Sequence, residues 1–372
     1  MSQPPMPAPG EPAPTFAQRS AGNPRYTFDA AAGRYLVLCF FHSAASDAAA
    51  LRLRAADERP DLFNDAFASF FGVSTDPADE SLQRVANRMP GYRFFWDHDL
   101  LVSGLYGMLS AEGERIGAWV VIDPTMRVID TIPFAPGGSD MARLMAVLAD
   151  LPPPGRFAGI ELQAPILFLP RVFEPGLCRH LIDLYDAQGG ELSGFMRQRD
   201  GKTVSVNDSH HKVRRDITLE DKDLIATLQA RILKKVVPEI AKVHMFHATR
   251  MERYIVSCYD GAEGGHFAPH RDNTTAGTAH RRFAVSINLN DDFEGGEVSF
   301  PEYGPRSFKA PAGGAVVFSC ALLHTVSRVT KGRRFAFLPF LYDDAAAALR
   351  AKNQHLIDLG GARDGERGSA AL

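Results

Sequence analysis

The first half of the chain alternates between continuous apolar runs and segments of helical character. A continuous apolar run is typical of a strand buried on both faces of a sheet, whereas Ala-rich and Pro-initiated segments favour helices. The predicted strands cover residues 34–41, 68–74, 118–122 and 128–133, and the predicted helices cover residues 44–56, 76–88 and 139–148. Because strands and helices alternate, this half is predicted to form a layered α/β domain.

Beyond residue 164 the pattern changes to helices followed by short strands. Amphipathic helices are predicted at residues 174–187 and 221–241, and the polar stretch 189–212 between them is expected to be a mobile loop. The predicted strands, separated by Gly and Pro turns, cover residues 166–169, 254–259, 283–289, 296–300, 314–318, 322–326 and 334–341. Such short strands with buttressing helices predict a double-sheet jelly roll, also called a double-stranded β-helix.

Three consecutive prolines, Pro152 to Pro154, mark the clearest boundary in the pattern. Each removes a backbone donor and fixes φ, so neither a helix nor a central strand can continue through them. A chain of 372 residues is long enough for two domains of about 100–200 residues. We predict a disordered lead-in at 1–14, a first domain at 15–150, a linker at 151–163, a second domain at 164–343 and a C-terminal helix or tail at 344–372.

Composition narrows the class of protein without indicating a function. Hydrophobic residues make up 45% of the chain and charged residues 23%, as in soluble globular proteins. The formal net charge of −3 gives no overall attraction to nucleic acid or to an anionic membrane. No apolar run approaches the roughly 18–20 residues of a membrane span, and the N-terminus lacks a signal-peptide pattern. We therefore expect a cytoplasmic protein with neither nucleic acid nor a membrane as partner.

The segment GHFAPHRDN, residues 265–273, contains a His and an Asp two positions apart. A protein-kinase catalytic loop uses the same tripeptide HRD, but it requires an Asn at the position that Gly277 occupies here. In extended chain, His270 and Asp272 point to the same side and can hold one metal ion. The facial site of non-haem iron oxygenases then requires a second His from elsewhere in the chain.

His324 is the candidate for that second His. It lies in an apolar, strand-like segment at 316–326, where an imidazole stays neutral and can coordinate a metal. Arg334 follows on the next predicted strand, on the face that Ala336 shares. A guanidinium directed inward from an apolar strand is unfavourable unless it pairs with an anion. A carboxylate is a suitable partner, because it can accept two parallel hydrogen bonds from the N–H groups of the guanidinium.

Residues 165–342 resemble the iron(II)/2-oxoglutarate dioxygenases of the prolyl 4-hydroxylase type. The sequence HRD at 270–272, the distant His324 and the basic Arg334 ten residues further on occur in the same order as the motif residues of that family. The opening strand and helix at 164–178 and the segment NLNDDFEGGEVSFP at 288–301 carry the resemblance further. The resemblance implies that Fe(II) is bound by three residues, and that 2-oxoglutarate is bound by two others. The Fe(II) ligands would be His270, Asp272 and His324, and the residues for 2-oxoglutarate would be Arg334, at its distal carboxylate, and Tyr259.

The same resemblance implies an activity. It implies that O2 hydroxylates a C–H bond of the substrate while 2-oxoglutarate is converted to succinate and CO2, with L-ascorbate as a further cofactor. The substrate stays open between peptidyl proline, a free amino acid and a small metabolite, because a fold does not specify a function. A non-catalytic binding or scaffold protein is the alternative from another class.

The remaining histidines are interpreted as structural. His266 is expected beside the pocket rather than on the metal, and His98, His244, His247 and His280 are expected to be surface or packing residues. The pair His210 and His211, next to Lys212, leaves two interpretations open. It belongs either to a solvated basic face or to a lid that closes over the iron.

Residues 15–150 resemble the peroxiredoxin (alkyl hydroperoxide reductase/thiol-specific antioxidant) family, which has a thioredoxin-like fold. That family has P-x-x-x-T-x-x-C after its first buried strand, whereas the aligned stretch here has Ser46 for the Thr and Ala49 for the reactive Cys. Peroxide reduction needs a thiolate, and Cys39 lies inside a buried strand. We therefore predict a scaffold, substrate-binding or dimerisation module, which makes a homodimer one assembly to consider. Peroxidase activity through Cys39 is the competing hypothesis.

Overall fold

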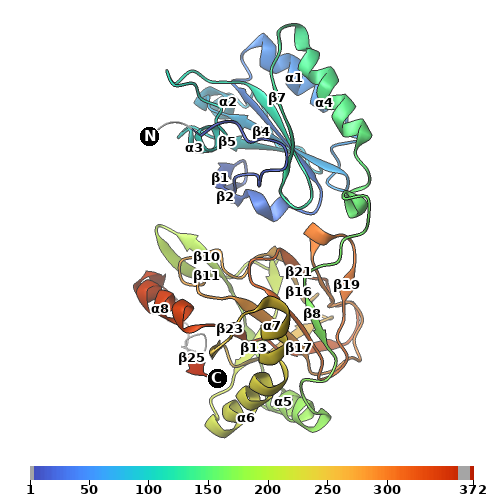
Figure 1. Cartoon of the computed structure of the whole chain (residues 1–372), viewed down its shortest axis with the longest axis vertical. Helices are drawn as coiled ribbons and strands as arrows, with labels where there is room; N and C mark the ends of the chain where they lie inside the picture. The colour runs from blue at the N-terminus through green and yellow to red at the C-terminus, as the bar shows by residue number, and fades with distance from the viewer. Residues whose placement is uncertain (1–3, 359–368) are drawn as a thin grey trace. The chain divides into compact units, whose positions relative to one another are not determined.

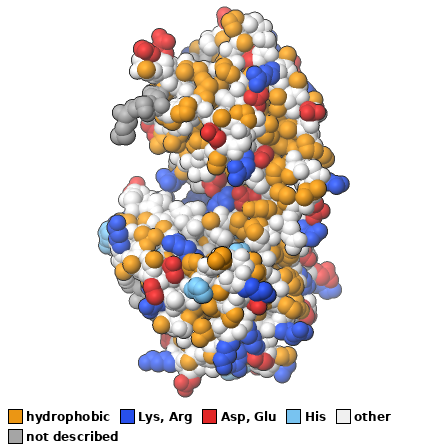
Figure 2. All heavy atoms as spheres, viewed as in Figure 1, with side chains coloured by type: hydrophobic (Ala, Val, Ile, Leu, Met, Phe, Trp, Pro, Cys, Tyr) orange, Lys and Arg blue, Asp and Glu red, His pale blue; other side chains and the backbone are white. Residues whose placement is uncertain are grey.

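The chain divides into two compact units, each with its own hydrophobic core (Figure 1). The computed structural model describes residues 4–358 and 369–372. Unit 1 comprises Met1–Ala164 with Pro301–Pro305, and unit 2 comprises Pro165–Phe300 and Arg306–Leu372. On the face drawn in Figure 2, Lys and Arg side chains are interspersed with Asp and Glu over both units. Among the described helices, none combines the length and the hydropathy that a membrane span needs.

Unit 1 is built on a seven-stranded sheet. Its strands are β1 (Ala17–Ser20), β2 (Asn23–Thr27), β3 (Tyr35–His42), β4 (Ala68–Ser74), β5 (Tyr92–Trp96), β6 (Ala118–Ile122) and β7 (Val128–Pro133), and its α-helices are α1 (Asp47–Asp57), α2 (Pro77–Ser81), α3 (Leu101–Leu105) and α4 (Ser139–Asp150). The strand order is β2-β1-β5-β4-β3-β6-β7. Strands β3, β4 and β5 are parallel, and the β3–β6 and β6–β7 pairs are antiparallel.

One core joins the sheet of unit 1 to two of its helices. Alternate residues of β3 and apolar residues of α1 and α4 belong to the same buried cluster, which includes Val37, Ala56 and Leu144. Strands β3, β4 and β6 are buried almost throughout, as continuous apolar runs require. The predicted thioredoxin-like α/β fold is thereby confirmed.

Two expectations for unit 1 were wrong. The described part of the lead-in, which was expected to be disordered, runs beside β7, where the Gly10 N–H donates to the Val128 carbonyl (2.8 Å) and the Val128 N–H donates to the Glu11 carbonyl (2.9 Å). The helix predicted at 76–88 ends after α2, at Ser81. Gln83 has a left-handed φ of 51°, a backbone conformation that does not continue an α-helix, and Leu82 beside it is 64% exposed.

Unit 2 contains three sheets and four α-helices among its described residues. The strands are β8 (Leu167–Leu169), β9 (Glu191–Leu192), β10 (Phe195–Arg199), β11 (Lys202–Val206), β12 (Lys212–Val213), β13 (Arg215–Thr218), β14 (Arg250–Glu252), β15 (Ile255–Asp260), β16 (His266–His270), β17 (Phe283–Asn288), β18 (Val298–Ser299), β19 (Ser307–Phe308), β20 (Ala315–Ser319), β21 (His324–Val326), β22 (Arg333–Phe337), β23 (Phe340–Tyr342), β24 (Ile357–Asp358) and β25 (Ser369–Ala371). The α-helices are α5 (Pro175–Gln188), α6 (Lys222–Lys235), α7 (Val237–His244) and α8 (Asp344–Asn353).

The two larger sheets of unit 2 are antiparallel throughout and form the predicted jelly roll. The ten-stranded sheet has the order β25-β14-β23-β17-β22-β15-β13-β9, with β20 and β8 joined to it through β17. The five-stranded sheet has the order β12-β16-β21-β18-β19. The small third sheet, β10-β11-β24, adds a hairpin that pairs with a C-terminal strand.

The ten-stranded sheet separates a helix-covered core from a pocket. Side chains alternate between the two faces of a strand. Phe335 and Phe337 on β22 and Val256 on β15 join the core that α5 and α6 cover. The intervening residues Arg334 and Tyr259 line a pocket on the opposite face. The alternation of apolar and polar residues in these strands therefore positions the pocket.

Three elements of unit 2 differ from the predictions. The stretch 189–212, expected to be a mobile loop, contains the hairpin β10–β11. The helix predicted at 221–241 is divided into α6 and α7, because Pro238 in the first turn of α7 has no N–H to donate to the preceding turn. The strand predicted at 334–341 is divided at Pro339 into β22 and β23. The C-terminal residues 359–368, expected to belong to a tail, lie outside the described residues.

Candidate metal centre

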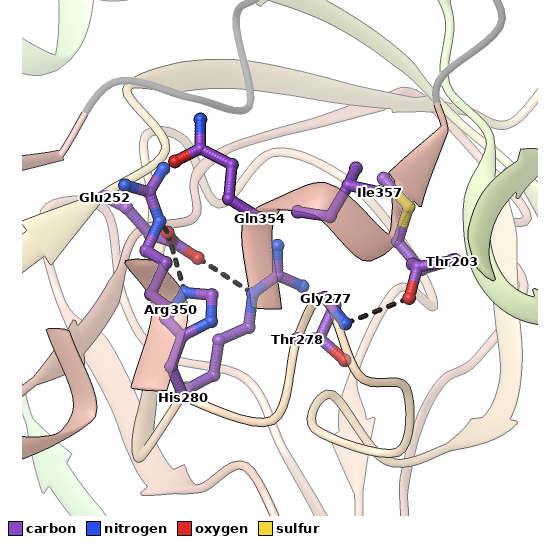
Figure 3. A pocket seen from close by; sticks show the side chains of 10 residues that line it. Thr203, Glu252, Gly277, Thr278, His280, Arg350, Gln354 and Ile357 are labelled. Atoms are coloured by element: carbon purple, nitrogen blue, oxygen red, sulfur yellow. Dashed lines mark hydrogen bonds and ion pairs between the residues drawn. The ribbon is translucent and has the colours of Figure 1, made fainter. Parts of the chain in front are cut away.

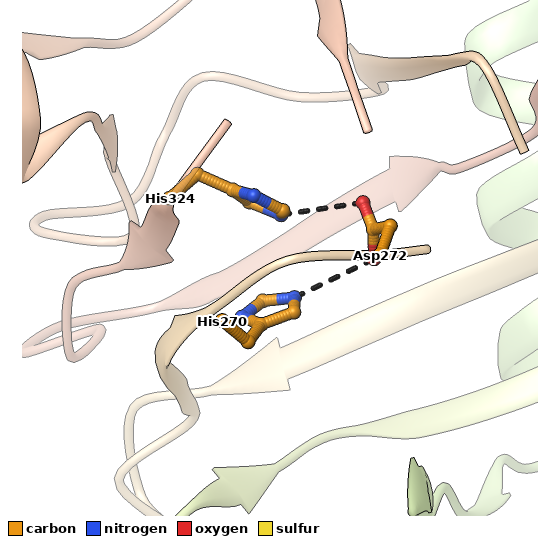
Figure 4. Close-up of side chains that lie close together, drawn as sticks. All are labelled: His270, Asp272 and His324. Atoms are coloured by element: carbon orange, nitrogen blue, oxygen red, sulfur yellow. Dashed lines mark ion pairs between the residues drawn. The ribbon is translucent and has the colours of Figure 1, made fainter. Parts of the chain in front are cut away.

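Two neighbouring strands of the five-stranded sheet bring the candidate metal ligands together. His270 ends β16 and lies opposite His324 on β21, and Asp272 follows β16 with its backbone N–H donating to the Cys320 carbonyl (3.0 Å). One candidate ligand atom from each of the three side chains lies within 4.8 Å of the others. Both imidazoles turn Nε2 toward the Asp272 carboxylate (Figure 4), at 3.6 Å for His270 and 3.4 Å for His324.

The hydrogen bonds of the two imidazoles fit a metal site. Nδ1 of His270 donates to the Ala268 carbonyl (2.8 Å), and Nδ1 of His324 donates to the Leu322 carbonyl (3.0 Å). A ring that donates from Nδ1 keeps its lone pair at Nε2 for a metal. Both Nε2 atoms therefore face the same point as the carboxylate.

Burial sets the charges of this triad. Burial, reinforced by His324, lowers the pKa of His270 to about 4, so its imidazole is neutral at neutral pH. Burial alone would raise the pKa of Asp272, but His324 and His270 outweigh it and hold that pKa below its usual range. Two imidazoles and one carboxylate that leave coordination positions open are the donor set of non-haem Fe(II) sites, and the residues present fit that ion.

Arg334 presents a buried cation to the same pocket. The residue is 1% exposed, and its Nε donates to Asn288 Oδ1 (3.0 Å) while Nη2 donates to Ser286 Oγ (2.8 Å). Nη1 has no hydrogen-bond partner among the described residues. Burial lowers the pKa of this guanidinium, because a buried charge without a counter-charge is unfavourable. The pocket is therefore prepared for an anion.

Tyr259 lies beside Arg334, opposite it in the pairing of β15 with β22. The Arg334 Cζ atom is 5.2 Å from the centre of the tyrosine ring. On its hydroxyl side, Tyr259 accepts a hydrogen bond from Arg214 Nη1 (3.4 Å), and Arg214 Nη2 also donates to Asp216 (2.5 Å). The buried Tyr259 hydroxyl is therefore held between this ion pair and the pocket.

Sequence reasoning missed Arg214 as a lining residue of this pocket. It lies in a run of charged residues just before β13, a setting that suggests a solvated surface, yet it is buried. The available signal was the alternation of Lys212, Arg214 and Asp216, which places the three on one face of an extended chain. Several apolar residues were also missed as lining residues, among them Phe267, Val298 and Phe318.

The other histidines divide between the interpretations given above. Among the candidate lid residues, the His210 side chain is 98% exposed, whereas the His211 ring lies 4.3 Å from the Phe195 ring and Lys212 is buried. His266 bonds the Gly264 carbonyl through Nδ1 (2.8 Å) and is not part of the metal triad. His280 is buried against Glu252. The pair at 210–211 is therefore neither wholly solvated nor wholly turned inward.

In unit 1, Ala49, the residue that the resemblance to peroxiredoxins aligns with their reactive Cys, lies in the first turn of α1. Ser46 caps this helix, with its Oγ accepting the Ala49 N–H (3.2 Å). Cys39 is fully buried in β3, and burial raises the pKa of its thiol well above the ordinary value. A thiol that stays protonated is a poor nucleophile.

Comparisons with known proteins agree with this arrangement. Residues 254–342 match the 2OG-Fe(II) oxygenase superfamily, and residues 9–131 match the AhpC/TSA family. A PKHD-type hydroxylase from Paracoccus denitrificans is 30% identical over 177 residues, which are 42% of this chain and 75% of that protein. The chain therefore belongs to the 2OG-Fe(II) oxygenases, and its first half matches the AhpC/TSA family model.

Other relatives match over shorter stretches. PKHD-type hydroxylases from Verminephrobacter eiseniae and Polaromonas sp. are 30% and 37% identical, over 28% and 22% of this chain. The chain spans 54% and 39% of the length of these two relatives. A solved prolyl hydroxylase from Trichoplax adhaerens, in complex with a hypoxia inducible factor peptide fragment, has a TM-score of 0.42 at 15% identity, over 50% of this chain and 87% of that one. Mycobacterium tuberculosis AhpC has a TM-score of 0.33 at 20% identity, over 39% of this chain and 92% of that one.

Proposed function

We propose that unit 2 is an Fe(II)- and 2-oxoglutarate-dependent dioxygenase that hydroxylates a C–H bond of its substrate, with release of succinate and CO2. The observation that carries this proposal is a buried guanidinium, that of Arg334, in the pocket of a two-His, one-carboxylate triad, with no carboxylate partner among the described residues. In this assignment His270, Asp272 and His324 would hold the metal. Arg334 and Tyr259 would hold the distal carboxylate of 2-oxoglutarate.

Each side chain has a defined task in this assignment. The Asn288 and Ser286 side chains fix the Arg334 guanidinium, so that its remaining N–H groups can meet a carboxylate without reorganisation. The donation from Arg214 to the Tyr259 oxygen leaves the Tyr259 O–H proton available for the same carboxylate. When bound, Fe(II) supplies the one-electron and O2 chemistry that amino-acid side chains lack.

Apolar walls complete the pocket. Phe267, Val298 and Phe318 line it together with the triad, and the His270 ring stacks on Phe267 with ring centres 3.5 Å apart. These walls exclude bulk water from the metal side of the pocket and strengthen electrostatic interactions inside it. They also fix the orientation of the His270 ring.

The finer assignments belong to the same proposal. We propose a small-molecule or peptide substrate, because the curated relatives carry the name hydroxylase, and L-ascorbate as a further cofactor because of the family likeness. We also propose a cytoplasmic protein whose unit 1 is a scaffold, substrate-binding or dimerisation module. The absence of a thiol at position 49 supports a non-peroxidase role for unit 1.

The decisive test is anaerobic addition of Fe(II) and 2-oxoglutarate to the full chain, followed by visible spectroscopy. A weak charge-transfer band is expected for the wild type and for His266→Ala, and its loss is expected for His270→Ala. His266 is the matched control, because it lies on the same strand but bonds a backbone carbonyl rather than joining the triad. A wild-type protein without the band would overturn the proposal.

A further inference from the structure

The loop at residues 273–281 connects the candidate ligand Asp272 to β17 and contributes no residue to the triad. At its first end, the Asp272 N–H donates to the Cys320 carbonyl (3.0 Å). At its second end, Arg281 Nε donates to Glu252 Oε1 on β14 (2.9 Å). The middle of the loop lies where segments far apart in the sequence meet (Figure 3).

Side chains from two distant segments hold the backbone in the middle of this loop. Gln198 Oε1, on β10, accepts the Ala276 N–H (3.0 Å), and Thr203 Oγ1, on β11, accepts the Gly277 N–H (2.9 Å). From the end of α8, Asn353 Nδ2 donates to the Ala276 carbonyl (2.8 Å). Because backbone groups away from water need partners, the hairpin β10–β11 and the end of α8 together fix two consecutive residues of the loop.

These contacts join the hairpin, the loop and the C-terminal segment into one packed junction. Thr203 is 1% exposed, its hydroxyl also donates to Gln198 Oε1 (3.4 Å), and it pairs with Ile357 of β24. A Cβ atom at Gly277 would lie 2.8 Å from Ile357 Cγ1 and 3.0 Å from Thr203 Oγ1, closer than ordinary van der Waals contact. Glycine therefore permits this close approach, and a shift of the hairpin or of the C-terminal segment also displaces the loop.

A second cavity, of about 150 Å³, lies beside this junction. Residues of the hairpin, the loop and the C-terminal segment line it, among them Met196, Thr203, Gly277, Thr278 and Ile357. A segment that borders a cavity has fewer dispersion contacts on that side than one surrounded by packed side chains. The position of the loop therefore depends on the three side-chain hydrogen bonds more than on packing.

We propose that Gln198, Thr203 and Asn353 are positioning residues of the metal centre, an inference that rests on the proposed role of Asp272 as a metal ligand. They fix the loop, and the loop restricts the chain directly after Asp272, so that its carboxylate stays directed at the two imidazoles in the metal-free protein. A site that is ordered in advance loses less conformational entropy when it binds. Metal affinity therefore depends on the hairpin and on the end of α8, although neither supplies a residue of the triad.

Hydrogen exchange of the backbone amides of residues 276 and 277, in the metal-free full chain, tests the hydrogen bonds themselves. Thr203→Val keeps the shape of the side chain but has no oxygen to accept the Gly277 N–H. It is expected to speed exchange at residue 277 about tenfold, the equivalent of one lost hydrogen bond. Thr203→Ser keeps the hydroxyl and is expected to exchange as the wild type does. Equal exchange in Thr203→Val and the wild type would overturn the inference.

Anaerobic titration of the same proteins with Mn(II) tests the positioning. Thr203→Val and Asn353→Leu are each expected to weaken Mn(II) binding about 3- to 10-fold, whereas Thr203→Ser should bind as the wild type does. The matched control on α8 is Arg250→Gln, which breaks the ion pair with Asp344 at the other end of the helix (2.8 Å). This control should also bind Mn(II) as the wild type does.

The outcomes separate this inference from the metal assignment. Wild-type Mn(II) affinity in Thr203→Val and Asn353→Leu would overturn the inference and leave the metal assignment intact. An equal loss of affinity in Thr203→Ser or in Arg250→Gln would also overturn it, because the effect would then be general destabilisation. A wild-type chain that binds no Mn(II) would overturn the metal assignment and this inference with it.

Discussion

His270 and His324 lie directly opposite each other in the antiparallel pairing of β16 with β21, with ring centres 4.2 Å apart. Both imidazoles are thus carried by hydrogen-bonded strands rather than by loops. Asp272 follows on the same chain segment, and its backbone is bonded to Cys320. A site held by a sheet is positioned more precisely than one held by loops, and this pairing explains how residues far apart in the sequence form one centre.

Replacing Asp272 by Ala is expected to weaken Fe(II) binding by more than about 100-fold. Mutation of a residue that only hydrogen-bonds a metal ligand already weakens metal binding about 10–100-fold, and Asp272 is itself a proposed ligand. The variant removes the only carboxylate of the triad. Anaerobic titration with Fe(II), or with Mn(II) as a stable substitute, measures the change. His266→Ala is the matched control and should bind as the wild type does. Unchanged affinity in Asp272→Ala would place the metal elsewhere.

Replacing Arg334 by Gln is expected to raise the KM for 2-oxoglutarate roughly 10–100-fold, the equivalent of the loss of a charge-assisted hydrogen bond to a buried carboxylate. Fe(II) affinity should be retained, because Arg334 is not part of the triad. The matched control is Arg333→Gln, since Arg333 points to the other face and pairs with Asp186 (2.8 Å). Succinate release measured against 2-oxoglutarate concentration checks this prediction, which fails if the two variants behave alike.

Replacing Glu252 by Gln is expected to destabilise unit 2 by about 3–5 kcal/mol at neutral pH, because a buried carboxylate is removed from two guanidiniums. The folded-state pKa of Glu252 is depressed to about 2, below the roughly 4.3 of an unfolded chain. The contribution of this carboxylate to the free energy of unfolding of unit 2 is therefore fully present above about pH 5 and is lost as the pH falls toward 2. The difference between wild type and variant should shrink over that range.

Urea unfolding followed by far-UV circular dichroism measures the effect of Glu252→Gln. Both tryptophans of the chain, Trp96 and Trp119, lie in unit 1. Tryptophan fluorescence therefore reports unit 1 separately and should be unaffected by the substitution. A wild-type to variant difference that stays constant from pH 7 to about pH 2 would contradict the assigned ionisation of Glu252.

Thiol-dependent consumption of hydrogen peroxide is expected to be undetectable for the full chain, and Cys39→Ser should change nothing. The Cys39 thiol is buried and its pKa is raised, so it supplies neither access nor a thiolate. A peroxide-consumption assay with an added thiol checks this. Turnover that disappears in Cys39→Ser would establish unit 1 as a peroxidase and refute the scaffold interpretation.

Local patterns were sufficient for much of the architecture. The continuous apolar runs predicted β4 and β6 with the bounds that the structure shows, because full burial of a strand leaves a direct signature in composition. The period of two in β22 predicted that Arg334 is directed inward, on the face that Ala336 shares, and the structure buries it in the lining of the pocket. Both predictions depend only on the chain within one element.

Elements that depend on distant partners were not predictable in this way. The hairpin β10–β11 is polar and resembles a loop in sequence. Its partner strand β24 is distant in sequence, because β11 pairs through Thr203 and β24 through Ile357. His280 was interpreted as a surface or packing residue and Arg214 was not recognised as a pocket residue, whereas the structure buries Arg214 in the pocket beside the triad and His280 in the wall of a cavity. Their burial depends on ion pairs with Asp216 and Glu252.

The sequence by itself determined the layered first half, the jelly-roll second half and the identity of the residues in the candidate metal triad. Only the tertiary structure decided that β16 and β21 are neighbours in register, and that a second cavity forms between the hairpin and the C-terminal segment. The physical reason is the distance along the chain over which each kind of interaction acts. Periodicity and propensity act between neighbours in the chain, whereas strand register and the pairing of buried charges are set by contacts between segments far apart in sequence.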